Sequence, residues 1–196
     1  MLILTNFRPI LTTHHHLHTR RTHHTPAQMA PLPAPAVPPP TINPATIVDV
    51  PAIVRLVTAA YTLYIPRIGR CPAPMQTDYG ALLTTPPPGS QITVLKQNDQ
   101  LLGLIELQIL TRSDHETSEL RINSLAVDPA AQGRGYGRLL MEHAEAVASQ
   151  AGVKAITLYT NVKMWENVEI YGKMGYVEVG RRVEDGFERV YFQKEV

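Results

Sequence analysis

The hydrophobic positions of this chain follow a helical period before residue 65 and strand-like runs after residue 90. Between residues 49 and 64, apolar side chains recur three or four positions apart: Ile53, Leu56, Val57, Ala60, Leu63 and Tyr64. This spacing predicts an amphipathic helix with one face against a core. Asp49 is placed to cap it, and Pro51 to stand in its first turn. The prolines and glycine of "IPRIGRCPAPM" then predict a loop, followed by a short helix over residues 75–83.

After residue 90 the pattern is that of strands separated by helices. The apolar runs "ITVLK" and "LLGLIELQIL" flank the polar "QNDQ", which predicts a hairpin, and "ELRINSLAVD" continues as a third strand. Helices are predicted over residues 134–150 and 164–174, ended by Gly152 and Gly175, with the strand "KAITLYT" between them. Residues 176–196 read as a second hairpin about "EDG". This order of elements predicts an α/β domain with a mixed sheet.

Residues 1–40 differ in composition from the rest of the chain. Six of the eight histidines lie between His14 and His24, and the segment "PLPAPAVPPP" follows. Such a stretch has no periodicity and cannot fill a core. We therefore expect a disordered His/Pro-rich extension over residues 1–40 and a folded domain over residues 41–196.

Three other roles compete for this extension. The histidines could bind a metal, and Pro35 and Pro38 form a PxxP ligand pattern. The extension could also be a mitochondrial presequence, because no acidic residue precedes Asp49 and three arginines do. Against this, Pro9 would interrupt an amphipathic helix and serine is absent. A start at Met29 would leave only a short proline-rich lead-in.

Length, charge and cysteine content limit what the domain does. A chain of 196 residues with 44% hydrophobic content suits one globular domain with a tail. The formal charge of +1, without a basic stripe, argues against a nucleic-acid partner. No apolar run approaches the ~20 residues needed to cross a bilayer, so no membrane partner is expected. Cys71 is the single cysteine, which fits a reducing, cytoplasmic compartment.

Three glycines at alternate positions, Gly133, Gly135 and Gly137, stand where a strand is predicted to give way to a helix. Glycine lets the backbone approach a ligand, and a helix N-terminus presents unpaired N–H groups and a positive dipole end. This arrangement indicates phosphate binding. A P-loop would need Gly-Lys-Ser/Thr, and a dinucleotide fold would need GxGxxG after the first strand; neither is present. A tight turn without a ligand is the structural alternative, but three glycines at a helix start would cost stability.

The stretch "SLAVDPAAQGRGYGRLLMEHA" resembles the acetyl-CoA-binding signature of the GNAT family, the GCN5-related N-acetyltransferases. Five residues match the signature V-x-P-x-x-Q/R-x-x-G-x-G/A: Val127, Pro129, Gln132, Gly135 and Gly137. The stretches "NVKMWENVEIYGKMGYVEVGRR" and "YTLYIPRIGRCPAPM" resemble the second half and the substrate loop of family members. The resemblance covers residues 40–196. It implies a mixed, mostly antiparallel twisted sheet with helices on both faces, and acetyl transfer from acetyl-CoA to an amine.

The resemblance also implies the residues that hold acetyl-CoA. Backbone N–H groups at the start of the glycine-rich helix would hold the pyrophosphate, with charge from two arginines, although Arg138 could equally be a solvated helix residue. Strand residues before the loop would pair with the pantetheine arm, and the N–H of Val127 would polarise the thioester carbonyl. The expected cofactor residues are Leu125, Ala126, Val127, Gln132, Gly133, Arg134, Gly135, Tyr136, Gly137, Arg138, Asn161 and Asn167. Of these, Asn161 could instead simply end its strand.

Acyl transfer to an amine needs a deprotonated amine, a stabilised oxyanion and a proton for the leaving thiolate. Tyr171 stands where the family places its general acid; a tyrosine packing on the sheet is the alternative. Some members carry a glutamate that acts as general base where this chain has Arg121. Glu119 lies two residues earlier on the same strand face and is therefore our candidate base. Glu106 is the second candidate, and either carboxylate could equally be a solvated side chain at a strand edge. No metal or covalent nucleophile is required, and Cys71 reads as a packed or loop thiol.

The acceptor is expected to be a small amine or amino acid, bound by the loop after the first helix. Tyr61, Tyr64 and Arg67 are the expected substrate residues, with Asp78 nearby, although both tyrosines also fall on the core stripe. An acceptor lysine or N-terminus in a protein is one alternative function. A catalytically silent acyl-CoA-binding module is the other. The C-terminal stretch "RVYFQKEV" could pair across a homodimer.

Overall fold

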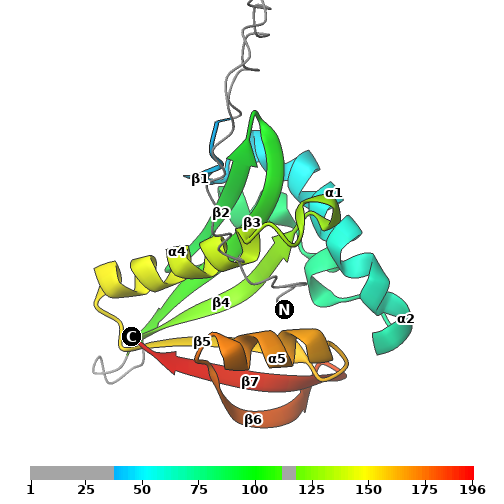
Figure 1. The fold of residues 1–196 in the computed structure, drawn as a ribbon, viewed down its shortest axis with the longest axis vertical. Helices are drawn as coiled ribbons and strands as arrows, with labels where there is room; N and C mark the ends of the chain where they lie inside the picture. The colour runs from blue at the N-terminus through cyan, green and yellow to red at the C-terminus, as the bar shows by residue number, and fades with distance from the viewer. Residues whose placement is uncertain (1–37, 112–117) are drawn as a thin grey trace, which may run out of the picture.

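The structure is a computed structural model that describes residues 38–111 and 118–196 (Figure 1). The predictions made for residues 1–37, including the histidine tract and a leader, lie outside the described residues. The first element of the described residues is β1 (Thr41–Pro44).

Seven strands form one sheet in the order β1-β2-β3-β4-β5-β7-β6. All neighbouring strands are antiparallel except β4 and β5, which are parallel. The strands after β1 are β2 (Ser90–Gln97), β3 (Gln100–Thr111), β4 (Ser118–Val127), β5 (Ala155–Asn161), β6 (Val177–Glu184) and β7 (Phe187–Glu195). β7 lies between β5 and β6, so the prediction that its stretch could pair across a dimer is wrong. The outer strands are β1 and β6.

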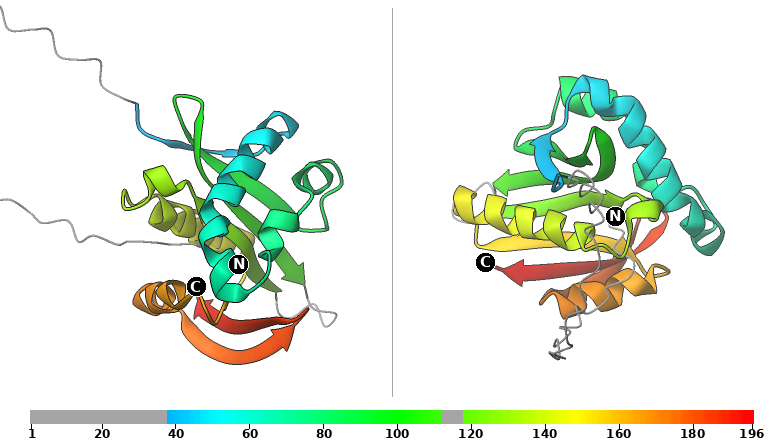
Figure 2. Two further views of the ribbon diagram at one scale, coloured as in Figure 1. Left: turned by 90° about the vertical axis from the view of Figure 1, so that its right-hand side faces the viewer. Right: turned by 45° about the horizontal axis from the view of Figure 1, so that its top comes forward.

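Helices cover both faces of this sheet. α4 and α5 lie on one side of it and α1 on the other (Figures 1 and 2). The α-helices are α1 (Val50–Tyr61), α2 (Ile65–Ile68), α3 (Tyr79–Thr84), α4 (Tyr136–Ala151) and α5 (Trp165–Lys173). Short 3₁₀ turns are η1 (Ile47–Asp49), η2 (Thr62–Tyr64), η3 (Ala73–Gln76) and η4 (Pro129–Ala131).

Each face of the sheet has its own hydrophobic core. The α4 and α5 side buries residues such as Leu120, Ile122 and Leu140, together with Tyr171. The α1 side buries the predicted helical stripe, from Ile53 to Tyr64, against β2, β3 and part of β4. Leu63 was expected in this stripe but is 40% exposed, because the chain tightens into the η2 turn there and the helical spacing no longer applies.

Asp49 stands at the N-cap of α1 and Pro51 in its first turn, as the sequence predicts, but the Asp49 side chain makes no capping hydrogen bond to this helix. The Asp49 carboxylate accepts hydrogen bonds from the backbone N–H and hydroxyl of Thr46, and an ion pair with Lys96 ties it to β2. The helical turns continue without a break from Ile47 to Ile68, 22 residues, which is long and apolar enough to cross a membrane by length and composition. The sequence prediction of no such run therefore missed this segment. Its buried stripe against the sheet accounts for the apolar composition.

Candidate active site

β4 and β5 separate partway along their length. They pair only over residues 119–122 of β4 and 155–158 of β5. Beyond that point β4 continues to Val127 and β5 to Asn161, and the facing edges have no strand partner in the described part of the chain. Parallel strands that stop pairing leave backbone donors and acceptors for a ligand that is itself peptide-like.

The backbone at the C-terminal end of β4 is oriented toward this opening. The N–H of Asp128 bonds to Leu102 O in β3 at 2.9 Å, so by strand alternation the polar groups of Leu125 and Val127 face away from β3. The Tyr61 hydroxyl donates to Leu125 O at 3.3 Å, and the Gln132 amide donates to Val127 O at 3.2 Å. The carbonyls are therefore partnered, while the two N–H groups point into the opening, as the predicted pairing with a pantetheine arm requires.

The loop before α4 forms an open backbone cradle. Asp128 accepts from Ala130 N at 2.8 Å and caps η4, after which Gly133 and Gly135 adopt positive φ angles of 76° and 83°. A Cβ built on either glycine would have no atom within 4 Å. These left-handed positions favour glycine, and the open space beside them adjoins the N-terminus of a 16-residue helix. The cradle fits the predicted pyrophosphate site.

The side chains around the cradle divide into two kinds. Gly137 is buried and Tyr136 packs partly against the core. These two residues therefore fix the start of α4 and bring no charge to the cradle. Arg134 is exposed beside the loop. Arg138 is exposed and pairs with Glu142 at 2.8 Å, one turn along α4. Arg134 is thus the arginine of the pair without a carboxylate contact within the described residues.

Tyr171 lies fully buried on α5, with its ring edge-on to Tyr176 and Phe192. Its hydroxyl has no hydrogen-bond partner among the described residues. Burial raises the pKa of Tyr171 well above its ordinary value, and the nearby hydroxyls of Tyr61 and Tyr64 add to this. The phenol therefore holds its proton at neutral pH and is able to donate it.

The structure gives the two predicted asparagines partners within the chain. Asn161 accepts from Lys163 N at 3.0 Å, which closes the turn after β5. Asn167 is buried, and its amide donates to the Thr160 hydroxyl at 3.4 Å. Asn161 is the last residue of β5 and Asn167 lies in the first turn of α5, and these contacts hold the turn and the helix in place.

The two candidate basic carboxylates lie in different surroundings. Glu119 lies where β4 and β5 are still paired, and it accepts from Arg121 and from Thr157, each at 3.2 Å. Glu106 lies on β3 directly opposite Ser124, where β4 has separated from β5. It accepts from the Asn123 amide at 3.2 Å, and burial raises its pKa, opposed by that hydrogen bond.

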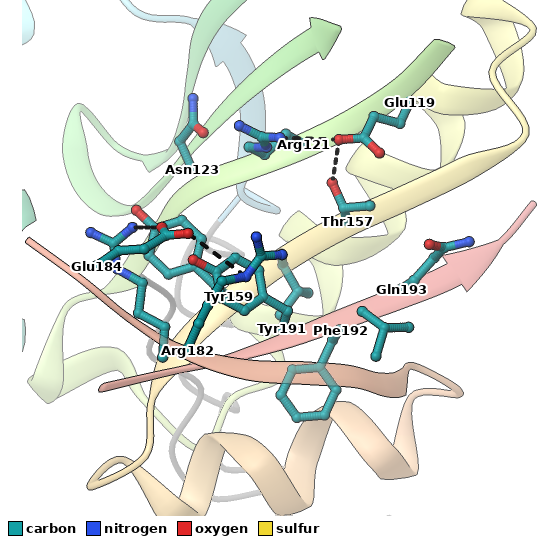
Figure 3. Close-up of a pocket in the computed structure, with 13 residues that line it drawn as sticks. Glu119, Arg121, Asn123, Thr157, Tyr159, Arg182, Glu184, Tyr191, Phe192 and Gln193 are labelled. Atoms are coloured by element: carbon teal, nitrogen blue, oxygen red, sulfur yellow. Dashed lines mark hydrogen bonds and ion pairs between the residues drawn. The ribbon is translucent and has the colours of Figure 1, made fainter. Parts of the chain in front are cut away.

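A hollow of about 410 Å³ lies on the sheet face opposite α4 and α5 (Figure 3). Its lining comes from β4, β5, β6 and β7, and is rich in charged and aromatic side chains. The lining residues are Glu119, Arg121, Asn123, Thr157, Leu158, Tyr159, Val179, Arg182, Glu184, Arg189, Tyr191, Phe192 and Gln193.

Stacked arginines form the β6–β7 wall of this hollow. The Arg189 guanidinium lies 4.5 Å from the Tyr159 ring centre and bonds to Glu184 at 2.7 Å. Arg182 lies 4.1 Å from the Tyr191 ring centre, with Glu184 at 3.7 Å. Sequence reasoning missed this wall. The alternation of Arg182 with Glu184, and of Arg189 with Tyr191, on a hairpin was the available signal.

The predicted substrate residues lie beside the opening rather than in the hollow. Tyr61 and Tyr64 are fully buried, and burial raises the pKa of Tyr64 to about 12. The Arg67 guanidinium pairs with Glu166 at 2.5 Å and lies 4.4 Å from the Trp165 ring centre, which joins α2 to α5. Their role in acceptor binding stays a prediction.

Within residues 38–111 and 118–196, no group of three or more His, Cys, Asp or Glu side chains could hold a metal ion. Cys71 is a half-buried free thiol, 4.0 Å from the Met75 sulfur. His143 is partly buried on α4. His115, the other histidine beyond the N-terminal tract, lies outside the described residues.

Comparisons with known proteins agree with this geometry. The model of the Acetyltransferase (GNAT) family matches residues 53–176. PaiA N-acetyltransferase from Thermoplasma acidophilum, solved in complex with coenzyme A, aligns with a TM-score of 0.62 and 15% identity, over 81% of this chain and 99% of that one. A GCN5-related N-acetyltransferase structure from Rhodopseudomonas palustris aligns with a TM-score of 0.63 and 17% identity, over 83% and 99%.

The ribosomal-protein-S18-alanine N-acetyltransferase from Escherichia coli aligns with a TM-score of 0.58 and 20% identity, over 80% of this chain and 94% of that one. A search of curated proteins found no match. At these identities the solved structures establish the fold alone. They confirm the predicted mixed sheet with helices on both faces.

Proposed function

Because the chain belongs to the GNAT acetyltransferase family, we propose that it transfers the acetyl group of acetyl-CoA directly to a primary amine of a small molecule. Family membership makes the chain an N-acetyltransferase that uses acetyl-CoA. The observation that carries the finer proposal is the separation of β4 from β5, because it brings a backbone edge, a buried phenol and a partly buried carboxylate to one place.

Acetyl-CoA supplies the activated thioester, and the chain offers a fitting backbone for the rest of the coenzyme. The N–H groups from Gln132 to Gly137 would hold the pyrophosphate at the positive end of α4. The inward N–H groups of Leu125 and Val127 would pair with the pantetheine amides. The Val127 N–H is the predicted donor to the thioester carbonyl, where it would stabilise the developing negative charge.

Glu106 is the better placed of the two candidate bases. It faces Ser124 across the β3–β4 pair, at the level where the strands have opened, whereas Glu119 is engaged by Arg121 and Thr157 where they are still paired. Burial raises the pKa of Glu106, which brings the carboxylate closer to the pH at which a base works well. We therefore assign Glu106, directly or through one water, to accept the amine proton.

Tyr171 is the proposed general acid. An unpaired hydroxyl, fully buried beside the opening, is costly unless a ligand completes its hydrogen bonding. The leaving thiolate would supply that acceptor, and the raised pKa of Tyr171 keeps its proton available until then.

The test uses thiol release from acetyl-CoA by the full chain, with a panel of small amines, polyamines, amino acids and short peptides. Tyr171→Phe should lower kcat by about 10²-fold or more, the usual worth of a positioned acid, while acetyl-CoA binding by calorimetry persists. Tyr176→Phe is the matched control: its hydroxyl is also buried and unpartnered within the described chain, but it lies toward Lys194 and Glu145. Acetyl-CoA binding without release to any acceptor would contradict the proposal.

A further inference from the structure

More arginines than carboxylates line the hollow on the sheet face opposite α4 and α5. Three arginines and two carboxylates line it: Arg121, Arg182, Arg189, Glu119 and Glu184. Both carboxylates are already paired with arginines from the same lining. A polyamine, with several positive charges, would meet guanidinium groups here without an unpaired acid to bind it.

Arg121 has binding capacity to spare. Its side chain is 43% exposed, and within the described residues its guanidinium makes one carboxylate contact, to Glu119 at 3.2 Å. A guanidinium has five N–H donors in a planar fork that matches a carboxylate. Glu119, which also accepts from Thr157, holds the fork in place at the sheet surface (Figure 3).

The other arginines have structural partners. Arg189 is 12% exposed and is held by Glu184, Asp185 and the Tyr159 ring. Arg182 is exposed, but it rests on the Tyr191 ring with Glu184 beside it. Glu184 and Asp185 balance the charges of these two arginines, and Arg121 is the arginine on the strand that leads to the opening.

Arg121 also lies at a useful distance from the proposed base. It pairs in register with Gln108, two residues along β3 from Glu106, which is about 7 Å along the strand. Arg121, Asn123 and Glu106 share one face, with Asn123 bonded to Glu106. A molecule spanning this interval would present an amine to Glu106 and an anionic group to Arg121.

We propose that the acceptor is a small amine that carries its own carboxylate, of the amino-acid type, and that Arg121 binds this carboxylate. The proposal rests on the proposed function, since it names the acceptor of the same transfer. The amine lies toward Glu106 and the opening, and the carboxylate lies in the hollow.

The experiment compares three series of acceptors with the wild-type chain: free amino acids, their carboxamides, and the corresponding decarboxylated amines. The free acids should have kcat/KM about 10-fold or more above the carboxamides, because a hydrogen-bonded charge pair is lost in the latter. Equal turnover of acids and carboxamides, or a preference for polyamines or for an aminoalkyl phosphate, would overturn the proposal. Failure to acetylate any amine would instead count against the proposed function.

Arg121→Gln then assigns the residue. KM for the free acids should rise about 10-fold or more while KM for the carboxamides stays unchanged. Arg181→Gln is the matched control, because Arg181 is also exposed and paired with one carboxylate, Glu178. It is in register with Val190, which is buried on the α5 side of the sheet, so Arg181 lies on the face away from the hollow. An Arg121→Gln enzyme with unchanged KM for the acids, or one that loses both substrate series equally, would remove Arg121 from this role.

Discussion

Replacing Gly135 by alanine separates ligand binding from backbone strain in the glycine-rich loop. Gly135 is the N-cap of α4, with φ +83°, and a Cβ there would meet no protein atom within 4 Å. Gly152 ends the same helix with φ +68° and equally open space. The two sites thus share their conformation and lack of steric contact, but only Gly135 borders the proposed pyrophosphate cradle.

The structure sets the stability cost of both substitutions. Because no atom clashes with the new methyl group, the only cost of alanine is the left-handed backbone conformation, roughly 1–2 kcal/mol. The lower entropy of the unfolded chain offsets about 0.4–1 kcal/mol of this cost. A net loss of about 1 kcal/mol lowers Tm by roughly 2–4 °C in a domain of this size. Gly135→Ala and Gly152→Ala should therefore shift thermal unfolding by similar amounts.

Binding should distinguish the two variants. A methyl group at Gly135 would occupy open space in the proposed cradle, where a phosphate oxygen would approach the backbone N–H groups. Losing one hydrogen bond to a charged group is worth about 1.5–3 kcal/mol, so Kd for coenzyme A should rise roughly 10- to 100-fold. Isothermal titration at 25 °C, where both variants are folded, measures this. Wild-type affinity in Gly135→Ala, or an equal loss in Gly152→Ala, would refute the assignment of the cradle.

Two pH-linked predictions follow from the carboxylates. Glu106→Gln should lower kcat/KM at neutral pH and remove the acidic limb of its pH profile; in the wild type that limb should lie above the ordinary glutamate value of 4.5, because burial raises the pKa of Glu106. Asp49→Asn should lower the free energy of unfolding at pH 7, measured with denaturant, by about 1–2 kcal/mol, because it removes the charge that pairs with Lys96 and accepts from Thr46. Burial raises the pKa of Asp49, but Lys96 and Thr46 together lower it below the ordinary value of 3.8. The ionised side chain therefore stabilises the fold above that value. The difference in stability between wild type and variant should vanish as pH falls through the folded-state pKa.

Hydrophobic periodicity was enough to predict the main elements of the fold. The apolar runs correctly placed the first hairpin and the two later helices, because these elements bury one side against the core, and the turn residues of "EDG" placed the second hairpin, whose β6 has no buried residue. The loop expected over residues 65–75 contains a four-residue helix, α2, because Pro66 stands in its first turn, where proline is tolerated. The order of the strands needed more than periodicity: nothing local in "RVYFQKEV" says that it inserts between β5 and β6.

The active-site face was harder to predict, because a bulge in β4 interrupts the alternation of its side chains beyond Ile122. Ile122 is opposite Leu107 and Ser124 is opposite Glu106, so Asn123 is an extra residue in the strand. Before it, odd-numbered side chains face the hollow; after it, Leu125 and Val127 face the other core. The alternation that places Glu119 on the face of Arg121 holds, because both residues precede the bulge, but it does not show at which level β4 and β5 separate. The bulge instead brings the opening of β4 opposite Glu106, and the adjacent polar pair Asn123–Ser124, between Ile122 and Leu125, was its sequence signal.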